Sequence, residues 1–281
     1  MTTTITPPAR LSSSKITLQT LRQRRAARMP IAMLTAYDFP TAKILQEAGV
    51  PVLLVGDSAA MTMLGLDSTV HATMDFLMTI TAAVRRGAPQ VFLMGDMPFA
   101  SYADAKTGVE NAARFMQQAG ADAVKVEADG RHEAIIAAMS AAGVPVCAHL
   151  GLLPQRVAQQ GGYRAKGRTR KEAERIIADA VLLTKAGAEM LLLEAVPDEV
   201  SAEICRRVDV PVFGCGAGPS CDGHVVVIHD MLGYNARVPK FVDVLGDVPH
   251  GILQAAQEYV RAVESREYPA QKHGYLMKNE E

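Results

Sequence analysis

Charged and polar residues that could carry out chemistry stand at or just after the ends of short apolar runs in this sequence. The runs are too short for helices and too continuous for half-exposed strands, which is typical of buried parallel strands. The polar residues at their ends are Asp38, Asp57, Ser58, Asp96, Lys125, Glu127, His149 and Glu194, followed by the GCGAG segment 214–218. Because charged side chains are rarely buried without partners, we expect this set to form one functional site.

Carboxylates dominate the set, and this predicts a metal ion. Several carboxylates in one cavity repel one another, and a bound divalent cation is the usual remedy. Asp57 and Asp96 are the expected ligands. Oxygen ligands favour Mg²⁺, and the sequence lacks the thiolate and imidazole spacing of zinc sites. Each carboxylate taken alone could instead be a helix cap or a member of a surface ion pair.

Lys125 and Glu127 lie two residues apart in VKVE, so along a strand both side chains point to the same face. The lysine could form an ion pair with Glu127, bind an anionic substrate or form a Schiff base. A Schiff-base lysine needs a lowered pKa, whereas a neighbouring carboxylate raises it. We therefore expect Lys125 to bind an anion.

Glu194 ends the most apolar run, MLLLEAV, and is the expected general base. Desolvation at such a position raises the pKa of a carboxyl towards the range useful for proton abstraction. His149, in CAHLGL, stands at a neighbouring run. Its position favours a role in the site, although a purely structural hydrogen bond stays open.

The elements that must position these residues follow from a weak internal repeat, in which a helical segment ends at Gly and an apolar run follows at once. Gly at a helix C-terminus adopts the left-handed turn without steric cost. Copies of the repeat are EAGVPVLLVGD, RRGAPQVFLMGD, QAGADAVKVE, AAGVPVCAHL and KAGAEMLLLE. The predicted strands are 31–37, 52–56, 91–95, 123–126, 144–148, 190–193, 212–214 and 225–228. The predicted helices are 18–28, 39–48, 75–86, 105–118, 132–142 and 171–185.

This order predicts an α/β protein with the fold of a (β/α)8 TIM barrel, whose active site lies at the carboxyl ends of the strands. We expect a flexible N-terminus over 1–16, a single barrel domain over 17–267 and a C-terminal tail over 268–281. The helix 18–28 is expected to cap the barrel floor. No GxGxxG follows the first strand and no P-loop lysine motif is present, which argues against a dinucleotide-binding sheet.

Composition limits the partners. Lys and Arg total 29 against 30 acidic residues, so the formal charge is −1 and neither nucleic acid nor an anionic membrane is expected to bind. The first residues contain no apolar stretch typical of a signal peptide, and the sequence has no apolar run of the ~18 residues that span a membrane, so we expect neither a signal peptide nor a membrane span. Its four cysteines form no CxxC pair, which favours reduced thiols and a cytoplasmic location.

The motifs around these residues carry a family resemblance. They are LTAYD (34–38), VGDS (55–58), GLDST (65–69), AAVRRGAP (82–89), GDMPF (95–99), VKVE (124–127), HLGLLPQ (149–155), GGY (161–163), LLLEAVP (191–197), GAG (216–218) and IHDMLG (228–233). With them the chain closely resembles the ketopantoate hydroxymethyltransferases. The resemblance implies a barrel of the phosphoenolpyruvate mutase and isocitrate lyase type, assembled as a homodecamer, in the pathway to pantothenate and coenzyme A.

The resemblance also implies roles. Asp57 and Asp96 would hold Mg²⁺, with Glu127 reaching it through water, and Glu194 would be the base. The residues implied to bind the 2-oxo acid are Asp57, Ser58, Asp96, Lys125 and His149. The implied reaction moves a hydroxymethyl group from 5,10-methylenetetrahydrofolate to 3-methyl-2-oxobutanoate through a Mg²⁺-stabilised enolate. The folate rests on the resemblance alone, because no independent folate motif is visible.

Three positions depart from the family pattern, namely VHATM at 70–74, Cys215 and His224. They leave open how the loop over the site holds the folate. A lyase or mutase of the same superfamily is the nearest rival, although the KKCGH motif of the lyases is absent. A regulatory module that binds the 2-oxo acid without turnover is a second rival, against which an intact Glu194 argues.

Overall fold

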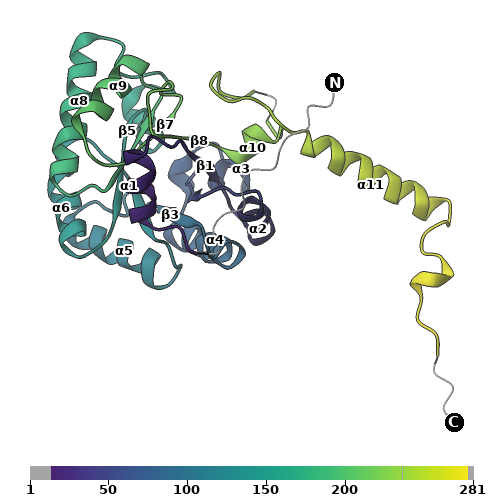
Figure 1. Cartoon of the computed structure of the whole chain (residues 1–281). Coiled ribbons are helices and arrows are strands. Elements are labelled where there is room, and N and C mark those ends of the chain that lie inside the picture. Colours follow the sequence, from purple (N-terminus) through teal and green to yellow (C-terminus); the bar gives the residue numbers. More distant parts are fainter. Residues whose placement is uncertain (1–13, 236, 278–281) are drawn as a thin grey trace. The chain divides into compact units, whose positions relative to one another are not determined.

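Eight parallel strands close into a barrel in the computed structural model, which describes residues 14–235 and 237–277 (Figure 1). The strands are β1 (Ile31–Thr35), β2 (Val52–Val55), β3 (Phe92–Asp96), β4 (Ala123–Glu127), β5 (Val146–Gly151), β6 (Met190–Glu194), β7 (Val212–Cys215) and β8 (Gly223–Val226). Each strand pairs with the next along the chain, and β8 pairs with β1, where Gly223 lies opposite Ile31. The prediction of a (β/α)8 barrel is confirmed.

Helices follow the strands and surround the barrel (Figure 1). They are α1 (Leu18–Ala26), α2 (Phe39–Glu47), α3 (Ala59–Thr62), α4 (Met74–Gly87), α5 (Ala105–Gln117), α6 (Glu133–Ala141), α7 (Val157–Gln160), α8 (Arg170–Lys185) and α9 (Asp198–Arg207). Short 3₁₀ turns are η1 (Thr69–His71), η2 (Gly130–His132), η3 (Pro154–Arg156) and η4 (Gln271–His273). The repeat's glycines behave as predicted after α2 and α5, where Gly49 has φ 85° and Gly120 has φ 72°.

Side-chain caps fix where several helices begin. Asp38 accepts a hydrogen bond from the backbone N–H of Thr41 at 2.7 Å and so caps α2. Asp104 caps α5 in the same way through Thr107, at 2.9 Å. Such caps stabilise a helix by about 1 kcal/mol. Asp38, expected among the site residues, is thus the helix cap that the sequence left open as an alternative.

The barrel interior is apolar from its floor upwards. The buried cluster there consists of Ile16, Leu21, Ile31, Met33, Val52, Leu54, Phe92, Met94, Ala123, Cys147, Met190, Leu192, Phe213 and Val225. Leu21, on α1, is fully buried in this cluster, so α1 caps the floor as predicted. Side chains alternate along each strand, and Ala123, Lys125 and Glu127 therefore share the inward face of β4. The interior consequently changes from apolar to charged towards the carboxyl ends.

The last strand begins two residues earlier than predicted, at Gly223 instead of Val225. A Cβ at Gly223 would lie 2.4 Å from the carbonyl oxygen of Ile31 on the paired strand. Glycine is therefore required by the close approach of β1 and β8, although in the sequence it looks like a turn residue.

The chain divides into two compact units, Met1–Ile228 and His229–Glu281. The barrel strands all lie in the first unit. The second contains α11 (Val248–Glu264), which the sequence analysis did not predict, and Asp247 caps this helix through the N–H of His250. The barrel-domain limits 17–267 stay a prediction, and the expected flexible N-terminus lies mostly outside the described residues. Within the described ranges, no helix combines the length and apolar character needed to cross a membrane.

Candidate active site

The carboxyl ends of β2 to β6 bring the predicted residues together. Asp57 follows β2, Asp96 ends β3, Lys125 and Glu127 lie on β4, and His149 lies on β5. All five are buried, with at most 5% of each residue exposed. Register explains the convergence, because Asp96 lies opposite Lys125 and Glu127 lies opposite His149 on neighbouring strands. Glu194 completes the set at the end of β6.

The ammonium group of Lys125 pairs with Asp96 rather than with Glu127. Its Nζ lies 2.8 Å from each carboxylate oxygen of Asp96. Residues two apart on one strand are ~6.5 Å apart along it, whereas neighbouring strands are separated by only ~4.8 Å. The cross-strand carboxylate is therefore the nearer partner. The structure thus contains a Lys125–Asp96 ion pair instead of the Lys125–Glu127 ion pair that the sequence left open.

The pKa of Lys125 is raised, which argues against a Schiff base. Burial alone would lower the pKa, but the charges of Asp96, Asp57 and Glu127 outweigh burial. The lysine therefore stays a fixed positive charge and suits the binding of an anion.

Excess negative charge is the main electrostatic feature of the site. Asp57, Asp96 and Glu127 share a single ammonium group, that of Lys125. Burial raises the pKa of Asp96 to about 7, with Lys125 opposing the rise and Asp57 adding to it. Burial likewise raises the pKa of Glu127 well above its ordinary value. A cation would relieve this repulsion.

The donor set fits Mg²⁺ in particular. Asp57 and Asp96 are adjacent, since the backbone N–H of Asp57 donates to Oδ2 of Asp96 at 3.1 Å. No group of three or more His, Cys, Asp or Glu side chains within 14–235 and 237–277 is arranged to hold a metal on its own. Mg²⁺ does not require one, because it is usually held by one or two carboxylates and completed by water and substrate oxygens.

Glu194 and His149 face each other across the site. Burial raises the pKa of Glu194 to about 7, with Lys125 opposing the rise. Nε2 of His149 lies 3.2 Å from Oε2 of Glu194, close enough for an ion pair but in a direction that makes no hydrogen bond. Burial lowers the pKa of His149 far below its ordinary value, so the ring is neutral. Neither ring nitrogen has a hydrogen-bond partner among the described residues, which leaves both available to a ligand.

Ser58 lies next to Asp57, a predicted metal ligand, and is linked to a buried tyrosine. The hydroxyl groups of Tyr37 and Ser58 are 2.8 Å apart. Burial raises the pKa of Tyr37 to about 12, although the bond to Ser58 opposes the rise. Tyr37 therefore stays protonated and fixes the orientation of the Ser58 hydroxyl.

Gln155 is a site residue that the sequence analysis missed. Its side-chain amide donates to Oδ2 of Asp57 at 2.8 Å and to the carbonyl of Met97 at 3.0 Å. Its backbone N–H faces both carboxylate oxygens of Glu127 at 3.2 Å. The hydroxyl of Tyr102 donates to Oε1 of Gln155 at 2.9 Å. Gln155 thus orients two of the predicted metal-site carboxylates at once.

A signal for Gln155 was present in the HLGLLPQ motif, which was used only for the resemblance. Gln155 lies beyond the end of β5, in the turn η3, so a pattern of polar residues at strand ends does not include it. The GCGAG segment, by contrast, follows β7 as expected, with Gly216 and Gly218 at positive φ.

The comparisons with known proteins agree with this geometry. The family model described as ketopantoate hydroxymethyltransferase matches residues 15–271. The chain belongs to this family. Its relatives include the 3-methyl-2-oxobutanoate hydroxymethyltransferase of Geobacillus thermodenitrificans (strain NG80-2), 48% identical over 254 residues that cover 90% of this chain and 91% of the relative. The enzyme of the same name from Bacillus subtilis (strain 168) is 46% identical over 251 residues, which cover 88% and 90%.

Solved structures share the fold at low identity. Phosphonopyruvate hydrolase in complex with oxalate and Mg²⁺ has a TM-score of 0.59 at 16% identity, covering 89% of this chain and 98% of that one. A 2,3-dimethylmalate lyase of the phosphoenolpyruvate mutase/isocitrate lyase superfamily has a TM-score of 0.58 at 16% identity, covering 92% and 98%. The resemblance found in the motifs is confirmed, and the chain is an enzyme of this family.

Proposed function

We propose that this enzyme transfers a hydroxymethyl group from 5,10-methylenetetrahydrofolate to 3-methyl-2-oxobutanoate and forms ketopantoate. The observation that carries the proposal is the position of Glu194, a carboxyl whose pKa is raised to about 7 by burial, beside a buried cluster of carboxylates and one ammonium group. General bases work best when their pKa lies near the working pH. Family membership supports the same reaction.

Asp57 and Asp96 would hold Mg²⁺, and Glu127 would reach it through water. When bound, the cation polarises the keto and carboxylate oxygens of the substrate and stabilises negative charge that develops on them. Gln155 keeps Asp57 and Glu127 in fixed orientations through its side-chain amide and backbone N–H. Outer hydrogen bonds of this kind typically change metal affinity 10- to 100-fold.

Lys125 and Ser58 would bind the 2-oxo acid. The Lys125 ammonium carries a permanent charge, and Tyr37 holds the Ser58 hydroxyl in place at 2.8 Å. Together with the neutral ring of His149, these groups orient the substrate so that its C3–H points at Glu194.

Glu194 then removes the C3 proton, and the electron pair of the broken C–H bond forms the enolate. The enolate carbon takes the one-carbon unit of the donor, and the net reaction consumes water and releases tetrahydrofolate. The neutral ring of His149 lies 3.2 Å from the Glu194 carboxyl, without a hydrogen bond between them. We also propose a cytoplasmic homo-oligomer, the homodecamer of the family, with small molecules rather than nucleic acid or membrane as partners.

A turnover assay tests the proposal. The protein is incubated with 3-methyl-2-oxobutanoate, 5,10-methylenetetrahydrofolate and Mg²⁺, and the product is identified by mass spectrometry. Formation of ketopantoate supports the assignment. Failure to form it, with turnover of phosphoenolpyruvate or a methylisocitrate-type acid instead, would place the protein with the lyases and mutases of the superfamily.

A further inference from the structure

A second cavity opens beside the candidate active site at the mouth of the barrel. Its volume is about 510 Å³, within the ~300–1,000 Å³ usual for small-molecule sites. We call it the mouth cavity. Its lining includes Val70, Phe99, Tyr102, Arg131, Ile135, Gln155 and Arg156. Because the side chain of Gln155 also bonds to Asp57, the mouth cavity borders the predicted metal site.

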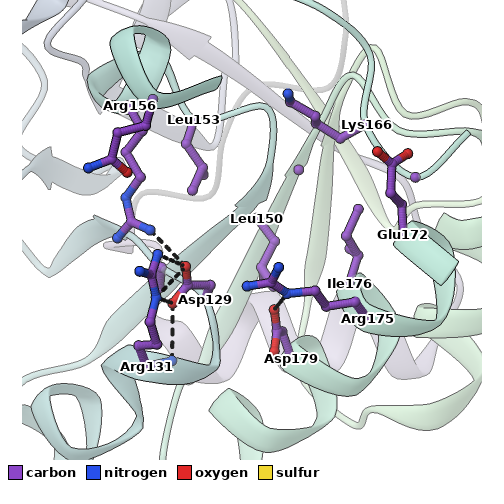
Figure 2. A pocket seen from close by; sticks show the side chains of 14 residues that line it. Asp129, Arg131, Leu150, Leu153, Arg156, Lys166, Glu172, Arg175, Ile176 and Asp179 are labelled. Atoms are coloured by element: carbon purple, nitrogen blue, oxygen red, sulfur yellow. Dashed lines mark hydrogen bonds and ion pairs between the residues drawn. The ribbon is translucent and has the colours of Figure 1, made fainter. Parts of the chain in front are cut away.

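One side of the mouth cavity carries an excess positive charge. Arg131 and Arg156 both bond to the single carboxylate of Asp129, at 2.6 and 2.8 Å (Figure 2). Nε2 of His132 lies 2.7 Å from NH2 of Arg156 and accepts that hydrogen bond. Two guanidinium charges thus face one carboxylate. The Arg131 side chain is 69% exposed and can turn to an incoming anion.

The other side of the mouth cavity is apolar and aromatic. Phe99 is 52% exposed, although it is a large hydrophobic residue next to buried neighbours. Val70, Tyr102 and Ile135 also line the cavity. Such a surface suits a flat aromatic ring, which packs well against a phenyl group.

We propose that the mouth cavity binds the one-carbon donor. The aromatic body of the folate lies on Phe99, Val70 and Ile135, and its glutamate carboxylates bind Arg131 and Arg156. This orientation directs the methylene group past Gln155 towards the substrate. The inference rests on the proposed function, because that function supplies an aromatic ligand with a carboxylate tail.

A neighbouring cavity of about 300 Å³, drawn in Figure 2, is a poorer candidate. It shares Arg131 and Arg156 with the mouth cavity and is also lined by Leu150 and Gly151 of β5, but not by Gln155 or Phe99. Its Arg175 lies 3.9 Å from the carboxylate of Asp179 (Figure 2) and lines this cavity but not the mouth cavity. This cavity therefore supplies a matched control for the test.

Calorimetric titration with tetrahydrofolate, without turnover, measures the affinity of the mouth cavity for this ligand directly. Arg131→Gln should weaken binding about 10- to 100-fold, the usual effect of losing a hydrogen bond to a charged group. Phe99→Ala should weaken it several-fold, and Arg175→Gln should bind like the wild type. Unchanged affinity in both mouth-cavity variants, or an equal loss in Arg175→Gln, would overturn the assignment.

A truncated ligand sharpens the test. 6-Methyltetrahydropterin lacks the whole benzoylglutamate tail and carries no carboxylate, so Arg131→Gln should bind it as well as the wild type does if the arginine contacts that tail. A loss of affinity equal to that for tetrahydrofolate would contradict the proposed orientation. In turnover, Arg131→Gln should raise KM for the folate donor far more than KM for the 2-oxo acid. If the wild type binds tetrahydrofolate but makes no ketopantoate, the proposed function fails and the binding site stands.

Discussion

Carboxylates at the two ends of the barrel differ in how well their negative charge is balanced. At the floor, Asp222 accepts a hydrogen bond from the N–H of Val212 at 2.9 Å and forms an ion pair with Arg25. At the mouth, Asp96 is buried and Glu194 partly buried with too little positive charge nearby, and desolvation raises the pKa of each to about 7. In barrels of this fold the floor serves stability and the mouth serves catalysis. The contrast shows that carboxylates without enough positive partners lie where a cation and a substrate are proposed to bind.

The largest effect is expected from removing a charge at the mouth. Asp57→Asn keeps the shape of the side chain and an oxygen for Gln155, but it weakens the predicted metal site. Ketopantoate formation should fall at least ~1,000-fold, because the cation supplies several kcal/mol of charge stabilisation. Calorimetric titration of Mg²⁺ should show the matching loss of affinity, whereas unchanged Mg²⁺ binding would remove Asp57 from the ligands.

A smaller loss is expected from the residue that orients the ligands. Gln155→Leu removes the amide that bonds to Asp57 and should lower Mg²⁺ affinity about 10-fold or more. Tyr102→Phe removes only the hydroxyl that bonds to Gln155 and should give a weaker effect of the same kind. The two variants are compared by Mg²⁺ titration beside thermal unfolding. A fall in melting temperature without any change in Mg²⁺ affinity would mean that Gln155 is only structural.

At the floor, removing a carboxylate should lower stability and leave activity unchanged. Asp222→Ala leaves Arg25 and the N–H of Val212 without their carboxylate and should lower the free energy of unfolding by about 1–3 kcal/mol. Its kcat/KM should stay within twofold of the wild type. Urea unfolding and the turnover assay measure the two quantities. A floor variant that loses activity while keeping its stability would break the comparison.

The contribution of Glu194 to the free energy of unfolding should fall as the pH rises. A carboxyl whose pKa is raised on folding stabilises the fold below its unfolded pKa, and this contribution is lost as the pH rises through the folded pKa. For Glu194 the window runs from 4.5 to about 7. Glu194→Gln should therefore be more stable than the wild type by about 1–3 kcal/mol near pH 8. The gain should disappear below about pH 4.5, and urea unfolding at both pH values checks this.

The sequence predicts most of the barrel and the strand-end residues because both follow from local periodicity. Lys125 and Glu127 share a face of β4 through the alternation of side chains, and this needs no knowledge of tertiary structure. The partner of Lys125 could not be predicted, since it depends on the register of β3 against β4. Gln155 reaches Asp57 only through the path of the η3 turn. Gly223 was left out of the predicted strand 225–228 because its close contact with β1 exists only in the closed barrel.

Exchange of the C3 proton of 3-methyl-2-oxobutanoate with deuterated water tests the central claim most directly. Followed by NMR with Mg²⁺ and without folate, it reports proton removal alone. The wild-type rate should rise with pH through an apparent pKa of about 7, because the carboxylate form of Glu194 is the base. Glu194→Gln should bind Mg²⁺ and substrate nearly as before, lose this pH dependence and exchange roughly 100- to 10,000-fold more slowly. Exchange at the wild-type rate in this variant would contradict the account and make His149 the next candidate for the base.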